Sequence, residues 1–376
     1  MAKEVDGRGC TPDRAPAVIS GLLGERWAGS ADGQEKALST LDEADWADWL
    51  DCARRHRVTQ LLHRALAGRD GVPERIQTAM SVDYRTTGRM NLLLLRALGV
   101  VLERLREAHI EVMVTKGAAL ALSVYGDICL RPMGDVDLVV DHADARRALS
   151  VLAELGFEPE SIDLCPGYAI DFTDQVALRH TDLGAVVLDL QWYLLDPLRY
   201  RPPVPADWLW SDAVPVEVEG TRAWVPSAEA QIVQLCAHVW KHRGEGEFLL
   251  LWLYDIALLV EVSRDSLDWP KVVGLAAQHG LANAVGEVLR LVWEEWRPPI
   301  PEKLWQRLAG SGARPVRRCR YSLDHVYGLG ARARALRCKL FPSISYMRRR
   351  YQVRGVGVLG AYGARLLGVV SQVWSN

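Results

Sequence analysis

The chain has 376 residues, of which 49% are hydrophobic, and its formal net charge at pH 7 is −2. This length allows two domains or one domain with helical additions, and the apolar content excludes global disorder. The small net charge argues against nucleic-acid binding through a basic surface, so no specific nucleic acid is expected as a partner.

Cysteine usage and the termini indicate a cytoplasmic protein. The seven Cys are odd in number and include no CxxC pair, which supports neither a zinc site nor a disulfide framework. The N-terminus lacks the apolar core of a signal peptide, and no stretch of about 18 apolar residues suggests a transmembrane helix. The Arg-, Ala- and Gly-rich composition is typical of a bacterial protein of high GC content.

The N-terminal part is predicted to be disordered over residues 1–15 and helical over residues 16–108. Apolar residues recur there at spacings of three and four, which is the helical period. Pro73 is a suitable start for a long helix that continues as far as Leu105. The charged residues Arg54, Arg55 and His56 are expected on a solvated helix face.

The stretch 112–140 is the centre of the predicted catalytic core, which spans residues 109–225. An apolar run, 112–114, suits a buried strand and ends at Lys116-Gly117, after which a short helical pattern follows. A turn at 131–134 leads into a second strand. Because strand side chains alternate, Asp135 and Asp137 are expected on the same face.

Paired carboxylates of this kind are typical of a magnesium site. Two close carboxylates raise each other's pKa, and a divalent cation relieves that repulsion. A third carboxylate, Asp189, alternates with Leu188 and Leu190 in a β-rich run downstream. Lys116 and Arg131 flank the same loop, as phosphate binding requires. The alternative is a solvated strand end or turn cap, because Asp is common in turns.

The remaining core elements follow in order. A helix over 145–155 is expected to end at Gly156, with strands at 174–179 and 185–194. Strands at 213–218 and 221–225 are expected to pair as a hairpin around Glu219-Gly220. The fold class is therefore α+β, with a small mixed sheet flanked by N-terminal and C-terminal helical regions.

The C-terminal helical region is predicted over residues 226–335. Ser227 is a suitable N-cap, with Ala230 at the N3 position, and His238 and His242 lie at i and i+4 on one face. Asp255, on a helix near 248–262, is expected to pair with His238, His242 or Lys241. The two His could bind zinc, but no third ligand is apparent. They are expected either to line the nucleotide or acceptor pocket or to have a purely structural role. Further helices are predicted over the ranges 272–279, 282–296 and 318–327.

The tail, 336–376, is both basic and apolar. One interpretation is an interfacial helix on anionic lipid, which would give contact with a membrane surface. A second is a helix that docks a protein partner or covers the active site. The third is a helix that packs on its own domain.

Taken together, these motifs resemble a family of uncharacterised bacterial nucleotidyltransferases within the polymerase-β-like superfamily. The resemblance runs from about Leu50 to about Ala257 and rests on Lys116-Gly117-Ala118, Tyr125, Arg131, Gly134-Asp135-Val136-Asp137 and Leu188-Asp189-Leu190-Gln191-Trp192. The sequence departs from the superfamily at Ala118, where a Ser is usual, in its longer spacer before Asp135, and at Gln191, where His is common in the family.

The resemblance implies transfer of a nucleoside monophosphate from ATP or another nucleoside triphosphate. It assigns two Mg²⁺ ions to Asp135, Asp137 and Asp189, and the triphosphate to Lys116, Gly117, Ala118 and Arg131. Pocket candidates are Tyr125, Gly134, Gln191, His238, His242 and Asp255. The acceptor would be a small molecule or a peptide, in natural-product tailoring or resistance. The alternative is a non-catalytic nucleotide-binding or antitoxin-like partner protein.

Overall fold

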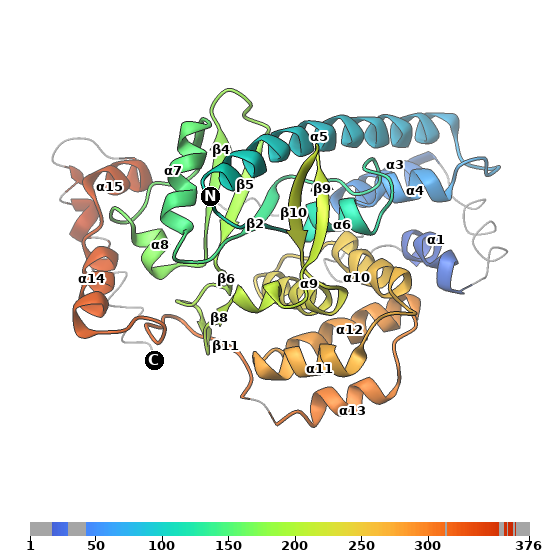
Figure 1. Cartoon of the computed structure of the whole chain (residues 1–376). Coiled ribbons are helices and arrows are strands. Elements are labelled where there is room, and N and C mark those ends of the chain that lie inside the picture. Colours follow the sequence, from blue (N-terminus) through green and yellow to red (C-terminus); the bar gives the residue numbers. More distant parts are fainter. Residues whose placement is uncertain are drawn as a thin grey trace. The chain divides into compact units, whose positions relative to one another are not determined.

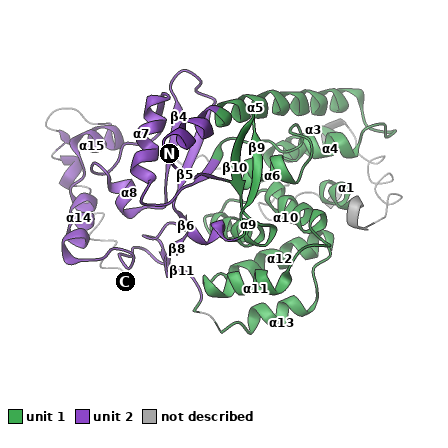
Figure 2. Ribbon diagram, in the orientation of Figure 1, with its two compact units in different colours: residues 1–99, 114–136, 212–314 green, residues 100–113, 137–211, 315–376 purple. Residues whose placement is uncertain are grey.

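The computed structural model describes residues 17–28, 43–312, 314–352, 357, 358, 360–363 and 365. The disorder predicted for residues 1–15 lies outside this part of the chain. The chain divides into two compact units, and each is built from three separate segments (Figure 2). Unit 1 comprises 1–99, 114–136 and 212–314, and unit 2 comprises 100–113, 137–211 and 315–376.

A seven-stranded mixed sheet has the strand order β3-β4-β5-β2-β1-β10-β9 (Figure 1). The predicted α+β class, with helical regions before and after the sheet, is therefore confirmed. The strands are β1 (Met113–Thr115), β2 (Val136–Val139), β3 (Phe157–Pro159), β4 (Gln175–His180), β5 (Val187–Gln191), β9 (Val214–Val218) and β10 (Thr221–Val225).

Unit 1 is mainly helical. The core lies around two helices that are buried on nearly every side, α9 (Ala228–Arg243) and α10 (Leu250–Val262), and both pack against α12 (Ala282–Trp296). The predicted N-cap is confirmed, because the Ser227 side chain accepts a hydrogen bond from the Ala230 amide. The other helices of this unit are α1 (Ala17–Ala28), α3 (Glu43–Arg55), α4 (Thr59–Ala65), α6 (Lys116–Ser123), α11 (Trp269–Gln278) and α13 (Lys303–Ala309).

The long helix predicted after Pro73 is α5 (Glu74–Glu107). The predicted hairpin is also confirmed, since β9 and β10 pair antiparallel. Glu219 and Gly220 have φ of 49° and 80°, the left-handed backbone that tight hairpin turns require. This turn lies close to α5, because a Cβ at Gly99 would be 2.7 Å from the Glu219 Cβ.

Unit 2 contains the strands that carry the predicted carboxylates. β3, β4 and β5 pair antiparallel, with Gln175 opposite Gln191 and Ala177 opposite Asp189. Leu188 and Leu190 are fully buried on one face of β5, so Asp189 and Gln191 point to the other face. The predicted helix α7 (Ala145–Glu154) ends before Gly156, whose φ of 84° confirms the left-handed cap. A short helix, α8 (Tyr168–Phe172), precedes β4.

The strand predicted over 185–194 is interrupted at Trp192. The Trp192 and Tyr193 amides both donate to the Asp174 carbonyl, which ends the regular pairing with β4, and the Trp192 indole Nε1 donates to the Thr173 carbonyl. The chain continues as β6 (Tyr193–Leu195), which pairs with β8 (Val204–Pro205), and a 3₁₀ turn, η1 (Asp207–Trp210), follows.

The helix predicted over 318–327 is wrong. This segment begins within β11 (Arg317–Arg318), which pairs with β7 (Tyr200–Arg201), and then forms turns. The Cys319 and Ser322 amides donate to the Arg199 and Leu198 carbonyls. These two amides are therefore satisfied by the loop at 198–199 and are not available for hydrogen bonds within a helix.

Two helices follow in the tail, α14 (Leu329–Leu340) and α15 (Ile344–Tyr351). Ala335 and Cys338 of α14 are buried against Tyr168, Phe172 and Leu198. α14 therefore packs within unit 2. It overlaps the predicted tail only over residues 336–340, and residues 366–376 lie outside the part of the chain that the structure describes, so the three interpretations of the tail stay predictions. None of the helices that the structure describes is both long enough and apolar enough to cross a membrane.

Candidate functional site

Three residues on one face of α5, Tyr84, Gly88 and Asn91, form a stripe that contacts the loop between α6 and β2. Tyr84 donates through its hydroxyl to Asp127, which also accepts the Cys129 amide. One turn further along the helix, a Cβ at Gly88 would lie 2.4 Å from the Cys129 sulfur. After another turn, Asn91 binds the loop again. The i, i+4, i+7 spacing places all three α5 residues on one helix face.

Asn91 is the most deeply buried residue of this stripe, with no solvent exposure. Its Nδ2 donates to the carbonyls of Ile128 and Arg131, at 2.5 and 2.8 Å, and its Oδ1 accepts the Met133 amide at 3.3 Å. A single amide side chain therefore satisfies three backbone groups of the loop. This fixes the backbone from which the Arg131 side chain starts.

The Arg131 side chain forms a buried ion pair with Asp255 of α10. Its Nη2 lies 2.8 Å from the Asp255 Oδ2, and the Tyr125 hydroxyl donates to Oδ1 at 2.7 Å. Burial alone would lower the pKa of Arg131, but the Asp255 carboxylate outweighs it, with smaller contributions from Tyr125 and Asp135, and the pKa is raised. Burial, followed by the Asp255 charge, also raises the pKa of Tyr125.

This arrangement corrects one expectation. Asp255 was expected to pair with His238, His242 or Lys241, but the structure pairs it with Arg131 and Tyr125. A guanidinium with several fixed donors satisfies a fully buried carboxylate better than a single imidazole does. The pair is also local to unit 1, where both residues lie.

The turn into α6 carries Lys116 and Gly117. Lys116 has a φ of 49°, a left-handed backbone that is uncommon for a residue with a side chain. Gly117 lies against the Arg131 guanidinium, because a Cβ at this position would be 2.4 Å from the Arg131 Nη1. Only glycine fits here while Arg131 holds its place. The next residue, Ala118, is buried in α6.

His238 and His242 lie on the side of α9 near Lys116. Burial and then the Lys116 charge lower the pKa of His238 well below its ordinary value, so this imidazole is neutral. The two imidazole centroids are 4.4 Å apart, and each ring also contacts Trp252 at about 5 Å. The Nδ1 of His242 lies 2.7 Å from Glu247. A neutral His, a second His and an indole form an aromatic wall here.

In unit 2, two amide side chains contact the predicted metal-binding carboxylates. Gln191 donates to Asp137 Oδ1 at 2.6 Å, and Gln175 donates to Asp189 Oδ2 at 3.0 Å. Gln191 reaches Asp137 from β5, so Asp137 points to the face that Gln191 and Asp189 share. Asp137 and Gln191 are buried, whereas Asp189 is half-buried.

Asp135 and the preceding Gly134 belong to unit 1 and are exposed. Carboxylate oxygens are the ligands that Mg²⁺ prefers, so the residue types fit this ion. Among the residues that the structure describes, no group of three or more His, Cys, Asp or Glu side chains is arranged to hold a metal. The joint role of Asp135, Asp137 and Asp189 stays a prediction.

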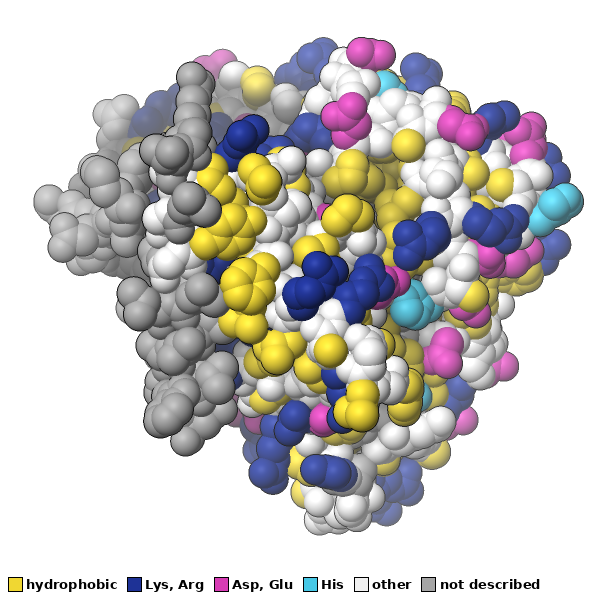
Figure 3. Space-filling view, turned by 90° about the vertical axis from the view of Figure 1, so that its left-hand side faces the viewer, with side chains coloured by type: hydrophobic (Ala, Val, Ile, Leu, Met, Phe, Trp, Pro, Cys, Tyr) yellow, Lys and Arg dark blue, Asp and Glu magenta, His cyan; other side chains and the backbone are white. Residues whose placement is uncertain are grey.

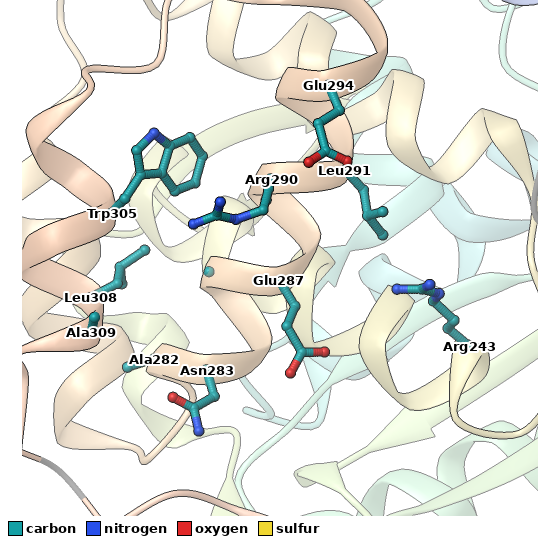
Figure 4. A pocket seen from close by; sticks show the side chains of 11 residues that line it. Arg243, Ala282, Asn283, Glu287, Arg290, Leu291, Glu294, Trp305, Leu308 and Ala309 are labelled. Atoms are coloured by element: carbon teal, nitrogen blue, oxygen red, sulfur yellow. The ribbon is translucent and has the colours of Figure 1, made fainter.

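Unit 1 also has a small pocket of about 380 Å³ between the end of α9, α12 and α13 (Figure 4). In Figure 4 Arg290 extends toward Trp305, and its guanidinium carbon lies 5.4 Å from the ring centroid. None of the predicted site residues lines this pocket. A larger cavity lies in unit 2 and is described below.

Sequence reasoning missed four residues of this region: Tyr84, Gly88, Asn91 and Gln175. A Gly and an Asn within one predicted helix are unfavourable residues, and each commonly marks a close approach or a specific hydrogen bond. Gln175 carried no comparable signal. His56 was expected on a solvated face, but it is buried and its Nδ1 accepts the Leu250 amide at the start of α10.

Residues 42–296 match the family model described as "Uncharacterised nucleotidyltransferase". This range covers more than half of the chain, and the protein belongs to that family of nucleotidyltransferases. No curated protein is similar enough to count as a match.

Among solved structures, this chain is similar to the solution structure of the antibiotic-resistance factor ANT(2'')-Ia. The match has 16% identity and a TM-score of 0.36, and it covers 53% of this chain and 98% of the other. The crystal structure of ANT(2'')-Ia in complex with adenylyl-2''-tobramycin matches with 15% identity and a TM-score of 0.35, covering 49% and 95%. An antigenic nucleotidyltransferase-like protein from Paracoccidioides brasiliensis matches with 17% identity and a TM-score of 0.31, covering 51% and 91%. All three similarities are distant.

Proposed function

We propose that this protein transfers a nucleoside monophosphate, AMP from ATP in the simplest case, to a small-molecule or peptide acceptor. One observation supports the proposal most strongly. In a chain of a nucleotidyltransferase family, Asp137 and Asp189 occupy the same face of neighbouring strands. Two carboxylates on one sheet face are what metal-assisted nucleotidyl transfer requires.

Asp135, Asp137 and Asp189 are the residues proposed to hold two Mg²⁺ ions. Bound Mg²⁺ would neutralise the triphosphate charge and make the α-phosphorus more open to attack. Gln191 and Gln175 hold the two unit 2 carboxylates through their amide donors. Such contacts orient metal-binding side chains, so we assign both Gln residues a positioning role.

Lys116, Gly117 and Ala118 are proposed to receive the triphosphate. Lys116 enters α6 with a left-handed backbone and Gly117 has no side chain, and the first amides of this helix are the proposed phosphate donors. Arg131 forms an ion pair with Asp255. Its main role in this proposal is to pack against Gly117 and fix the position of the turn. Direct contact between Arg131 and phosphate stays a prediction.

The transfer step forms one bond and breaks another. An acceptor oxygen or nitrogen forms a bond with the α-phosphorus, while the bond from that phosphorus to the bridging oxygen breaks. The pyrophosphate group leaves with the electron pair of the broken bond. The proton of the acceptor passes to the Asp189 carboxylate or to solvent.

The test is label transfer from [α-³²P]ATP to the low-molecular-mass fraction of a bacterial extract, with products separated by chromatography and weighed by mass spectrometry. The purified full chain is expected to add one nucleotidyl unit to an acceptor. Asp137→Asn should reduce this transfer by at least about 100-fold. The matched control is Asp141→Asn, since Asp141 is exposed and its carboxylate accepts the nearby Ala143 amide, a bond that the Asn oxygen can also accept.

Retained transfer in Asp137→Asn would contradict the proposed role of this carboxylate. Magnesium-dependent ATP binding without turnover on any fraction, together with a stable complex in pull-down, would favour the non-catalytic alternative. Mass spectrometry of the product also identifies the acceptor.

A further inference from the structure

Unit 2 contains a cavity of about 1060 Å³ whose lining residues all belong to this unit. α7, α8, β3 and β4 provide one side of the lining, and α14, α15 and Arg365 provide the other. Ligand pockets for small organic molecules have volumes of roughly 300–1,000 Å³. This cavity is therefore large enough for a substrate rather than for a few waters.

The lining of the cavity includes a residue that contacts the predicted catalytic carboxylate Asp189. Asp174 and Gln175 line the cavity, and Gln175 donates to the Asp189 carboxylate at 3.0 Å. Gln175 and Asp189 share one face of the sheet, because Ala177 is opposite Asp189 and strand side chains alternate. A molecule in this cavity could contact Gln175, which holds the Asp189 carboxylate.

Another part of the lining is cationic and aromatic. The Lys339 ammonium lies 3.4 Å from the Tyr321 ring centroid, and the Arg365 guanidinium lies 5.4 Å from that of Tyr346. The Arg365 Nε donates to the Lys339 carbonyl at 2.9 Å, so the two cations come from adjacent positions. Within the part of the chain that the structure describes, neither cation forms an ion pair with a carboxylate.

The two like charges disfavour each other. Burial and then the Arg365 charge lower the pKa of Lys339, against a smaller opposing effect of Asp196. An anion placed between the two side chains would relieve the repulsion and gain charge-assisted hydrogen bonds from both. Figure 3 looks onto the side of unit 2 that carries α14 and α15, where Lys and Arg side chains (dark blue) gather between hydrophobic ones.

The lining as a whole carries a small excess of positive charge. It contains six Arg and Lys residues and four Asp and Glu residues. One of those carboxylates, Asp163, accepts the Ala169 amide, and burial raises its pKa. The positive excess favours an anionic ligand over a polycationic one.

We propose that this cavity is the acceptor pocket and that the acceptor carries a phosphate or carboxylate group, which Lys339 and Arg365 bind. The assignment of the acceptor rests on the proposed nucleotidyl transfer, whereas the anion site does not. The tyrosine rings Tyr168, Tyr321 and Tyr346 provide flat apolar surface for a ring of the same molecule. The nucleophile of the acceptor would lie at the Gln175 end.

The anion site is tested first, by calorimetric titration of the full chain with inorganic phosphate and, separately, with citrate, in EDTA. The wild-type chain is expected to bind at least one probe, and the stronger probe shows whether the group is a phosphate or a carboxylate. The double variant Lys339→Gln/Arg365→Gln should bind at least about tenfold more weakly. Arg337→Gln, at an exposed position of α14 outside the cavity, is the matched control and should differ by less than about twofold.

Arg349→Gln is a second variant, because Arg349 lines the cavity and is exposed, and its one described hydrogen bond is a long contact of 3.3 Å from Nη2 to the Glu160 carbonyl. It should weaken binding by about threefold. Absence of binding by both probes, or unchanged affinity in a folded double variant and in Arg349→Gln, would overturn the anion site. Asp137→Asn should bind the probes as the wild type does, so loss of transfer in that variant leaves this result intact.

The acceptor assignment is tested by fractionating the extract on ion exchangers before the label-transfer assay. The accepting molecule should be retained on an anion exchanger at neutral pH. Accepting activity found only in the cation-exchanger fraction would refute an anionic acceptor while leaving nucleotidyl transfer in place. The Lys339→Gln/Arg365→Gln variant should raise the KM for the acceptor and leave the KM for ATP unchanged.

Discussion

Arg131 and Asp255, separated by 124 positions in the sequence, form a buried ion pair in which the guanidinium Nη2 lies 2.8 Å from the carboxylate Oδ2. The pair joins the loop before β2 to α10, and the Tyr125 hydroxyl completes it. Its guanidinium also lies directly behind Gly117. The position of the proposed phosphate-binding turn therefore depends on a charge pair within unit 1.

Removal of one partner of this pair should be strongly destabilising. Asp255→Leu leaves the Arg131 charge buried and unpaired, so we expect a loss of about 3–5 kcal/mol in the free energy of unfolding. The double variant Arg131→Met/Asp255→Leu removes both charges and should recover a large part of that loss. Urea denaturation measures both. Asp265→Leu, at an exposed position, is the control and should stay within about 0.5 kcal/mol of wild type.

Gly117→Ala should impair the phosphate-binding turn. The added Cβ would lie 2.4 Å from the Arg131 Nη1, and that side chain is fixed by Asp255. We expect a loss of about 1–3 kcal/mol in stability and a higher KM for ATP. Gly274→Ala is the matched control, because no atom lies within 4 Å of its added Cβ in α11. It should stabilise the chain by about 0.5–1 kcal/mol. Equal effects of both substitutions would contradict the close approach.

Gln191→Leu should weaken the response to magnesium. The Gln191 amide is the donor that contacts the buried Asp137 carboxylate, and loss of such orienting contacts typically reduces metal affinity by about 10- to 100-fold. The magnesium concentration that gives half-maximal label transfer should rise by a factor in this range. Gln278→Leu, on the exposed side of α11, should leave it unchanged. Gln191→His, which introduces the residue common in the family, should retain transfer.

Stability should decrease as the pH falls below about 6.5. Burial, followed by the Arg55 charge, lowers the pKa of His56, and its neutral Nδ1 accepts the Leu250 amide. Because the folded pKa lies below the ordinary 6.5, the unfolded chain binds a proton at a higher pH than the folded chain. The stabilisation is complete above that pH and is lost as the pH falls toward the folded pKa.

Unfolding midpoints between pH 8 and pH 5 measure this effect. His56→Asn retains an acceptor but cannot titrate, so its midpoint should decrease less on acidification than that of the wild type. His109→Asn, at an exposed position, should follow the wild-type curve. An identical pH dependence for His56→Asn and wild type would show that another group is responsible, with His238 the first to examine because its pKa is also lowered.

The fold class and most elements could be predicted because their signals are local. The hairpin at Glu219-Gly220, the cap at Ser227 and the end of α7 at Gly156 each depend on a few adjacent residues. The partner of Asp255 could not be predicted, because spacing along one helix suggests His238 and His242 while the actual partner lies 124 residues away. The helix predicted over 318–327 was wrong for the same reason. The Cys319 and Ser322 amides donate to carbonyls of the distant loop at 198–199 instead of to a helix of their own.

The candidate site shows the same division between local and distant signals. Alternation along β5 predicted that Asp189 points away from Leu188 and Leu190, and the full burial of the two Leu residues beside the half-buried Asp189 agrees. The hydrogen bonds from Gln175 to Asp189 and from Asn91 to the loop at 128–133 join segments that are distant in the sequence. The periodicity of hydrophobic residues within one segment could not predict them.

The segmented make-up of the two units limits how the protein can be divided. Each unit takes three stretches of chain, and α5 itself passes from one to the other between residues 99 and 100. No single truncation can yield either unit intact, so deletion series and gene fragments should produce aggregated or degraded products. Isolating unit 1 or unit 2 for study would need a redesigned chain in which new linkers rejoin the three stretches.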